Sequence, residues 1–279
     1  FSAASYLVDT YAIAGASATA APSPGDVALY IAWFPKILAG PIERGTHFLP
    51  QLRGGLRCDP ALLVPSLQLI VWGLFKKVVI ADNLAPVVDH GFGIAAYATP
   101  VDLVFAVYFF AFQIYCDFSG YTDIAIGVSQ LFGLRLMENF RRPYLARSTA
   151  EFWSQRWHIS LAAWFRDYLF IPLGGSRVGP ARRYLNIMLV FAVSGLWHAG
   201  LGYGVGWTFL VWGSLNGLYQ WISIATSGLW RRLGSALPRL RDSTALRIAR
   251  TLLTFHLVCL AWVFFRAKSI TDALLVLRR

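Results

Sequence analysis

The feature that most constrains this chain is a long stretch without any charged side chain, which runs from Tyr184 to Trp230. A soluble protein carries about 25% charged residues, whereas this chain carries 14%, together with 57% apolar residues and a mean hydropathy of +0.53. So few polar groups cannot cover so much apolar surface, which must therefore face lipid. The composition predicts a polytopic membrane protein and excludes a disordered chain.

Basic residues gather on both sides of the uncharged stretch. Residues 135–183 hold nine Lys or Arg against three acidic residues, and residues 231–250 hold six against one. Basic loops beside apolar segments are typical of the cytoplasmic side of membrane proteins. We therefore attribute the net charge of +11 to membrane topology, and we expect both basic blocks to face the cytoplasm and no nucleic acid to bind.

Apolar runs recur along the whole chain and predict an all-α fold with transmembrane, re-entrant and interfacial helices. Several runs are shorter than the roughly 20 residues of a full span, so some are expected to re-enter the membrane or to lie at its edge. No internal repeat is visible, and we expect one domain over residues 1–279. The expected helices cover residues 1–14, 27–42, 62–81, 101–116, 120–134, 184–198, 206–227 and 248–265.

Residues 151–170 are expected to form an interfacial helix. Their large apolar side chains recur at spacings of three and four, which places them on one stripe of a helix. Trp beside Arg suits the boundary between lipid and water. The stripe consists of Trp153, Trp157, Leu161, Trp164 and Tyr168.

His198 is the strongest candidate for chemistry. It follows Ser194-Gly195-Leu196-Trp197 at the end of an apolar run. An ionisable group inside a membrane segment is costly and indicates a function, and a neutral imidazole can act as a general base. The alternative is a structural histidine whose ring N–H is bound by a neighbouring carbonyl group.

His158 is the second candidate, because it also follows a Trp in a segment at membrane depth. Taken alone it is more typical of a polar residue at the membrane interface, but His158 and His198 could line one cavity. His47 and His90 are expected in loops, and His256 is expected to be a packed histidine within a span.

Asp117 and Asp123 fit the first turn of a helix, where the helix dipole favours carboxylates and Ser119 suits the N-cap. A role in a proton relay is the alternative.

Glycine at every second position of residues 200–206 predicts a flexible hairpin turn, with a pore element as the alternative. The three widely spaced cysteines indicate neither a disulfide framework nor a zinc site.

Five stretches resemble the membrane-bound O-acyltransferase family, in its bacterial alginate O-acetyltransferase branch. They follow in order over nearly the whole chain, and the resemblance implies that one group of helices precedes this chain and another follows it. The stretches are Phe34-Pro-Lys-Ile-Leu-Ala-Gly-Pro-Ile42; Tyr115 to Gly127; Glu138-Asn-Phe140 with Pro143-Tyr144; Glu151 to Gly175; and Ser194 to His198 with Trp207-Thr-Phe209.

The resemblance implies acyl transfer, most simply of acetyl, from a cytosolic thioester such as acetyl-CoA to a hydroxyl group. His198 takes the position of the catalytic histidine that removes the hydroxyl proton, and His158 that of a polar partner that orients the acyl group or donates to the oxyanion. The acceptor is a polysaccharide or a periplasmic acetyltransferase partner protein. The family also implies a place in the bacterial inner membrane, no bound cofactor and no metal.

Two features depart from the family pattern. Eight residues separate His198 from Trp207, more than the family has, and Asn216 stands where many relatives have another histidine. The alternatives to polysaccharide O-acetylation are D-alanyl transfer to teichoic acid, a transporter or channel, and a membrane scaffold without catalytic activity.

Overall fold

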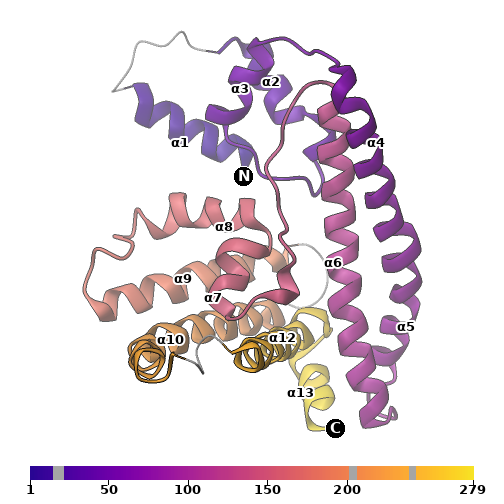
Figure 1. Ribbon diagram of the computed structural model, residues 1–279, viewed down its shortest axis with the longest axis vertical. Helices are drawn as coiled ribbons and strands as arrows, with labels where there is room; N and C mark the ends of the chain where they lie inside the picture. The colour runs from indigo at the N-terminus through magenta and orange to yellow at the C-terminus, as the bar shows by residue number, and fades with distance from the viewer. Residues whose placement is uncertain (15–21, 201–205, 239–242) are drawn as a thin grey trace. The chain divides into compact units, whose positions relative to one another are not determined.

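The computed structural model describes residues 1–14, 22–200, 206–238 and 243–279 (Figure 1). Every regular element within these ranges is a helix, which confirms the all-α prediction. Residues 201–205, which hold most of the glycine-rich stretch, lie outside the described residues.

Within the described residues, three helical stretches are long and apolar enough to cross a membrane. They are Pro60–Gly93, Pro100–Leu131 and Thr244–Arg266. The share of the most apolar window that is buried inside the protein is 17% in the first stretch and 28% in the second, so most of their side chains remain for lipid or for further helices.

The chain folds into two compact units, and it passes between them several times, so neither unit is a continuous piece of sequence. The expectation of one domain stays a prediction. The first unit comprises Phe1–Asn83, Gln113–Phe140 and His158–Trp164, and the second comprises Leu84–Phe112, Arg141–Trp157 and Phe165–Arg279.

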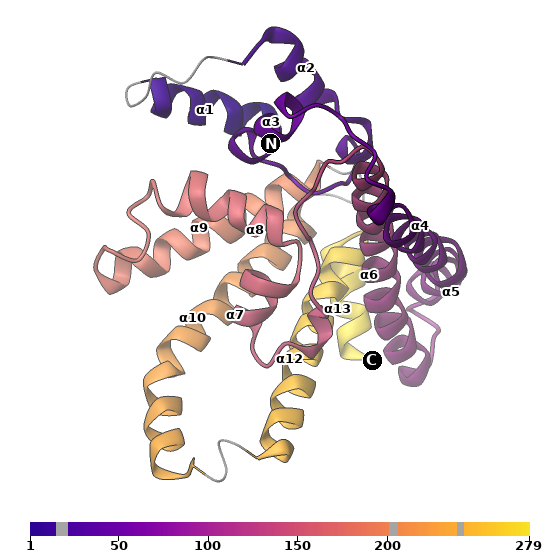
Figure 2. The ribbon, with the colours of Figure 1, turned by 45° about the horizontal axis from the view of Figure 1, so that its top comes forward.

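In the first unit, short helices pack around an aromatic core that includes Tyr30, Trp33 and Phe48. The long helix α4 lies beside the second half of α6, as both views show (Figures 1 and 2). Glycines allow this approach, because a Cβ at Gly73 would lie 2.6 Å from the carbonyl oxygen of Gly120. The helices are α1 (Ser2–Ala14), α2 (Pro24–Ala32), α3 (Gly45–Arg53), α4 (Pro60–Leu74), the π-helical turn Phe75–Ala81, α5 (Asp82–Gly93), α6 (Pro100–Leu131) and α8 (Ile159–Phe165); α5, α6 and α8 each run on into the second unit.

The helix expected over residues 27–42 is much shorter in the structure, because α2 ends at Ala32. Trp33 leaves the helical conformation, with φ −56° and ψ 104°, just before Phe34 and Pro35. Proline disfavours a helical conformation in the residue before it and has no N–H to donate. A short 3₁₀ turn, Phe34–Lys36, follows instead of a continued helix.

The two helices expected over 101–116 and 120–134 are a single helix, α6, and Ser119 is not an N-cap. The prediction was wrong because it took Asp117 and Asp123 as a helix start. Both carboxylates instead lie within the helix, where lysines of the π-helical turn neutralise them.

The interfacial helix expected over residues 151–170 is broken, so its aromatic residues do not form one stripe. A π-helical turn, Phe152–Arg156, is followed by Trp157 in an extended conformation. His158 then adopts a positive φ of 45°, and α8 begins at Ile159. A second π-helical turn, Arg166–Phe170, follows α8.

In the second unit, α9 and α10 form a close antiparallel pair, and α10 also packs on α12 (Figure 2). A Cβ at Gly195 would lie 2.3 Å from the carbonyl oxygen of Phe209, and one at Gly213 would lie 2.3 Å from that of Phe191. Glycine is required at both positions because a side chain there would push α9 and α10 apart. The close approach therefore sets the position of α9, which carries His198, relative to α10. The helices are α7 (Thr149–Glu151), α9 (Pro180–Ala199), α10 (Trp207–Ala236), α12 (Thr244–Arg266) and α13 (Ile270–Arg278).

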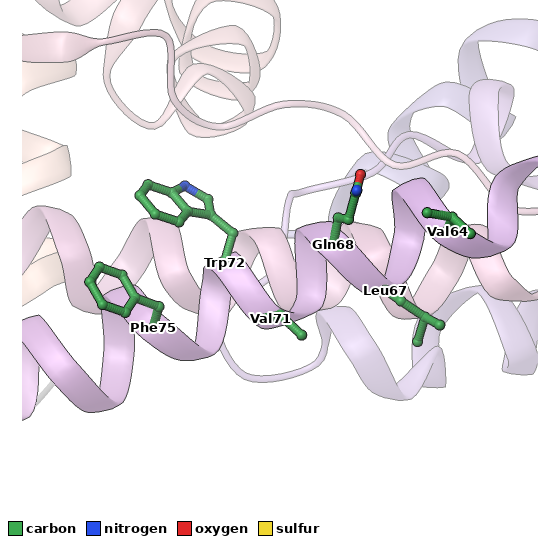
Figure 3. A pocket seen from close by; sticks show the side chains of 6 residues that line it. All are labelled: Val64, Leu67, Gln68, Val71, Trp72 and Phe75. Atoms are coloured by element: carbon green, nitrogen blue, oxygen red, sulfur yellow. The ribbon is translucent and has the colours of Figure 1, made fainter.

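A shallow apolar groove of about 510 Å³ runs along one face of α4 and onto the π-helical turn (Figure 3). One continuous helical stretch supplies all the side chains that line it, and apart from one amide they are apolar. The groove is therefore an unpartnered helix face, suited to lipid or to another helix, and it holds no catalytic group. Its lining residues are Val64, Leu67, Gln68, Val71, Trp72 and Phe75.

Candidate active site

His198 lies in the last turn of α9, in the second unit. Its Nδ1 is 2.7 Å from the backbone carbonyl oxygen of Ser194, one turn earlier. A carbonyl oxygen can only accept a hydrogen bond, so Nδ1 carries the hydrogen and, in the neutral ring, Nε2 keeps the free lone pair. The bound N–H of the structural alternative is therefore present, and it leaves Nε2 as the ring nitrogen that could accept a proton.

Aromatic rings surround the His198 imidazole. The ring centroids of Trp197, Trp212 and Phe265 lie 4.6, 5.0 and 5.5 Å from that of His198. Trp212 stacks in turn on Trp262, with centroids 6.0 Å apart. Because these rings come from α9, α10 and α12, the packing of three helices sets the orientation of His198. Trp212 is buried whereas Trp197 is exposed, so the rings shield the imidazole from water on its α10 side.

Asn216, the residue that departs from the family pattern, is fully buried on α10 beside this cluster. Its Oδ1 accepts a hydrogen bond of 2.9 Å from Trp153 Nε1, and its Nδ2 donates to the carbonyl oxygen of Trp212 at 2.8 Å. Asn216 therefore links the turn that carries Trp153 to the backbone of a residue that contacts His198. Nothing in the sequence spacing indicates this link, because Trp153 and Asn216 are far apart in the chain.

His256 on α12 shows the same bond from Nδ1 to a carbonyl oxygen four residues earlier, at 2.7 Å from Leu252. Its Nε2, however, lies 2.7 Å from the hydroxyl group of Tyr108. Both ring nitrogens of His256 are thus engaged. His256 nevertheless lies exposed on α12, so the prediction of a packed histidine was wrong. His47 and His90 lie in α3 and α5, and the expectation that they lie in loops was wrong.

His158 is buried in the first unit, with 8% of its surface exposed. Its ring meets the ring of Phe118 on α6 edge to face, at a centroid distance of 4.7 Å. A positive φ is uncommon for a residue with a side chain and is often found at functional sites. The conformation at His158 lets the chain turn into α8, whose first turn closes with the bond from Ala162 N–H to the carbonyl oxygen of His158.

A buried polar group supports the turn after His158. Asn139 Oδ1 accepts a hydrogen bond of 2.6 Å from Ser160 Oγ, and Ser160 Oγ accepts one of 3.0 Å from the backbone N–H of Ile42. These bonds connect three of the stretches that carry the family resemblance. His158 belongs to the first unit and His198 to the second, so the shared cavity expected for the two histidines stays a prediction.

Asp117 and Asp123 pair with two consecutive lysines of the π-helical turn. Lys76 Nζ lies 2.7 Å from Asp123 and 3.0 Å from Ser119 Oγ, and Lys77 Nζ lies 2.6 Å from Asp117. These ion pairs hold α6 against the preceding helical stretch, which favours the structural interpretation over a proton relay. No group of three or more potential metal ligands occurs among the described residues.

Sequence reasoning missed a second buried cluster, around Glu43 in the first unit. The Glu43 carboxylate accepts hydrogen bonds from the backbone N–H of Met137 and pairs with His47 Nδ1 at 2.7 Å. Burial raises the pKa of Glu43 above its ordinary value, and burial lowers the pKa of Lys36 to about 8. The spacing of four between Glu43 and His47 is the only local signal for this cluster.

The model of the membrane-bound O-acyltransferase family matches residues 14–265 of the chain. The chain belongs to the membrane-bound O-acyltransferase family. The match includes both candidate histidines, the aromatic cluster around His198 and the buried cluster around Glu43. The family is membrane-bound, which agrees with the three apolar spans.

Relatives within the family differ in the acceptors that their names give. The chain is 40% identical over 255 residues to a peptidoglycan O-acetyltransferase of Helicobacter pylori, covering 91% of this chain and 46% of the relative. It is 37% identical over 273 residues to a probable alginate O-acetylase of Azotobacter vinelandii, covering 98% and 50%. It is 27% identical over 251 residues to a teichoic acid D-alanyltransferase of Bacillus subtilis, covering 86% and 60%. The chain thus spans about half the length of the O-acetyltransferases that it matches.

Proposed function

We propose that the protein containing this chain is an O-acetyltransferase of the bacterial inner membrane. It transfers an acetyl group from a cytosolic thioester such as acetyl-CoA to a hydroxyl group, for O-acetylation of an exopolysaccharide resembling alginate. The observation that carries the proposal is His198, whose Nδ1–H is held by Ser194 so that Nε2 is left as the base. The family match adds the reaction class.

The chemistry follows from this geometry. His198 Nε2 takes the proton of the acceptor hydroxyl as its oxygen forms a bond to the carbonyl carbon of the thioester. The tetrahedral intermediate then collapses, the carbon–sulfur bond breaks, and the thiolate takes the proton back from His198. The products are an ester and a free thiol, with no net change in protons. His158 is assigned the role of orienting the acyl group.

The acceptor is a hydroxyl group of a glycan or of a periplasmic acetyltransferase that passes the acetyl group on. Relatives with 36–40% identity bear the names of O-acetylases of peptidoglycan or alginate, whereas the D-alanyltransferases are 26–27% identical. This difference favours acetyl over D-alanyl as the transferred group. Radiolabelled acetyl and D-alanyl thioesters, offered separately to membrane vesicles that contain the full-length protein, distinguish the two.

The decisive experiment compares two histidines with similar local geometry. His198→Ala should lower the rate of acetyl transfer by roughly 10²–10⁴-fold, the usual value of a general base. His256→Ala is the matched control, because both of its ring nitrogens are engaged by other groups, and it should retain activity. Normal acetylation by the His198 variant would refute the mechanism. Solute transport that survives loss of both His198 and His158 would favour a transporter instead.

A further inference from the structure

Two buried indole N–H groups in the aromatic cluster that includes His198 have no hydrogen-bond acceptor among the described residues. They belong to Trp212 and Trp262, whose side chains are 2% and 1% exposed. Their rings stack with an angle of 13° between the planes, and the Trp212 ring lies 5.0 Å from that of His198. Buried donors without acceptors are rare in folded proteins, and such a donor at a catalytic site is often kept for a ligand.

The unused donors are not a general result of aromatic crowding in this unit. Trp153 packs against Trp212 at 5.5 Å, yet its indole N–H donates to Asn216. Trp221, further along α10, donates to the carbonyl oxygen of Tyr184 at 2.8 Å. Among the described buried indoles of this unit, those without an acceptor are therefore the stacked pair Trp212 and Trp262, although Tyr219 and Gln220 on α10 also have buried polar groups without a partner.

We propose that Trp212 Nε1 donates a hydrogen bond to the carbonyl oxygen of the acyl thioester as this oxygen becomes an oxyanion, with Trp262 Nε1 as the second donor. The inference rests on the acetyl transfer proposed above. When the acceptor oxygen attacks and His198 takes its proton, the carbonyl π-electrons move onto the oxygen, where the indole N–H groups stabilise the charge. These electrons re-form the carbonyl double bond as the carbon–sulfur bond breaks.

The surroundings suit this role. An oxyanion site works best when its donors are fixed before the reaction and shielded from water, and the stacked indoles are both buried and held by neighbouring rings. Phe265 contacts all three participants, with centroid distances of 5.1, 5.2 and 5.5 Å to Trp212, Trp262 and His198. The half-buried ring of Phe265 thus packs against both indoles and the imidazole and holds the three rings relative to one another.

The test removes the donor and keeps the ring. In the full-length protein, Trp212 is replaced by 3-benzothienylalanine, in which sulfur takes the place of the indole N–H. The kcat for transfer from radiolabelled acetyl-CoA should fall about 10²–10³-fold. KM should change little, because the bond strengthens only in the transition state. The thermal unfolding midpoint should not fall, since the Trp212 N–H has no acceptor to lose in the part of the chain that the structure describes.

The same replacement at Trp221 is the matched control. It removes a hydrogen bond to the backbone and should lower the unfolding midpoint while leaving kcat unchanged. The analogue at Trp262 should lower kcat less than the analogue at Trp212. An unchanged kcat at position 212, or a loss at position 262 alone, overturns the assignment to Trp212.

The outcomes also separate this inference from the proposed function. If the wild-type protein transfers acetyl and the His198 variant does not, the function stands, and an active analogue at Trp212 refutes the oxyanion donor alone. If the folded wild-type protein transfers acetyl from no thioester, the proposed function itself fails.

Discussion

Gly213 offers a quantitative test of how tightly the α9–α10 pair must pack for activity. A Cβ at this position would lie 2.3 Å from the carbonyl oxygen of Phe191 and 3.3 Å from Cα of Gly195, whereas ordinary contact begins at 3.4 Å. Gly213→Ala must therefore separate the two backbones by about 1 Å. His198 lies one turn beyond Gly195 and contacts the residue that precedes Gly213, so this displacement reaches the imidazole from both helices.

Two effects follow from the displacement. A misplacement of about 1 Å near a catalytic group can lower the rate about 10²-fold. Overpacking of a well-packed interior usually costs about 1–3 kcal/mol of the free energy of unfolding. We expect Gly213→Ala to show both losses, measured as kcat for acetyl transfer by the purified full-length protein and as its thermal unfolding in detergent.

Gly228, on the same helix, is the matched control. A Cβ at Gly228 meets no atom within 4 Å, and alanine stabilises a helix by about 1 kcal/mol relative to glycine. Gly228→Ala should therefore keep full activity and unfold no earlier than the wild type. A Gly213→Ala protein with wild-type kcat and unfolding midpoint would show that the close approach of α9 and α10 does not position His198.

Three further predictions concern charged groups and topology. Lys76→Met leaves Asp123 without its partner and should cost about 3–5 kcal/mol in the free energy of unfolding. The double variant Lys76→Met/Asp123→Asn should recover most of this loss, and equal denaturation curves for the two variants would contradict the pairing. Burial lowers the pKa of Lys36 to about 8 from 10.5, so the folded state disfavours the ammonium form, and the unfolding free energy should rise between those pH values. In unfolding scans at a series of pH values, Lys36→Met should show no such rise. A wild-type unfolding free energy that stays constant over this pH range would refute the prediction. Gly179 suits a labelling cysteine, because a Cβ there meets no atom within 4 Å. After removal of the exposed Cys58, this cysteine should react with a membrane-impermeant thiol reagent only from the cytoplasmic side. Labelling from the periplasm would show the opposite topology.

The fold class could be predicted from composition and charge pattern alone. The uncharged stretch from Tyr184 to Trp230 and the low overall charge leave only lipid to cover the apolar surface, and helices are the simplest way for such segments to satisfy their backbone groups. Predicting helix ends from neighbouring residues failed where a side chain far away in the sequence paired with a charge inside a helix. Asp117 and Asp123 would break an apolar helix in isolation, but Lys76 and Lys77 neutralise them within α6.

The candidate site also combines features visible in the sequence with features visible only in the folded structure. The sequence alone marked His198, because an ionisable residue at the end of an apolar run is costly wherever it lies. The bond from His198 Nδ1 to Ser194 is local, one turn back on α9, and leaves Nε2 as the nitrogen that could accept a proton. The tertiary structure separated His198 from His256, whose second nitrogen meets Tyr108. It also brought the ring of Trp212, whose indole N–H has no acceptor among the described residues, beside His198. Sequence periodicity reports the environment of a helix face, whereas hydrogen-bond partners from other helices depend on packing that no local pattern records.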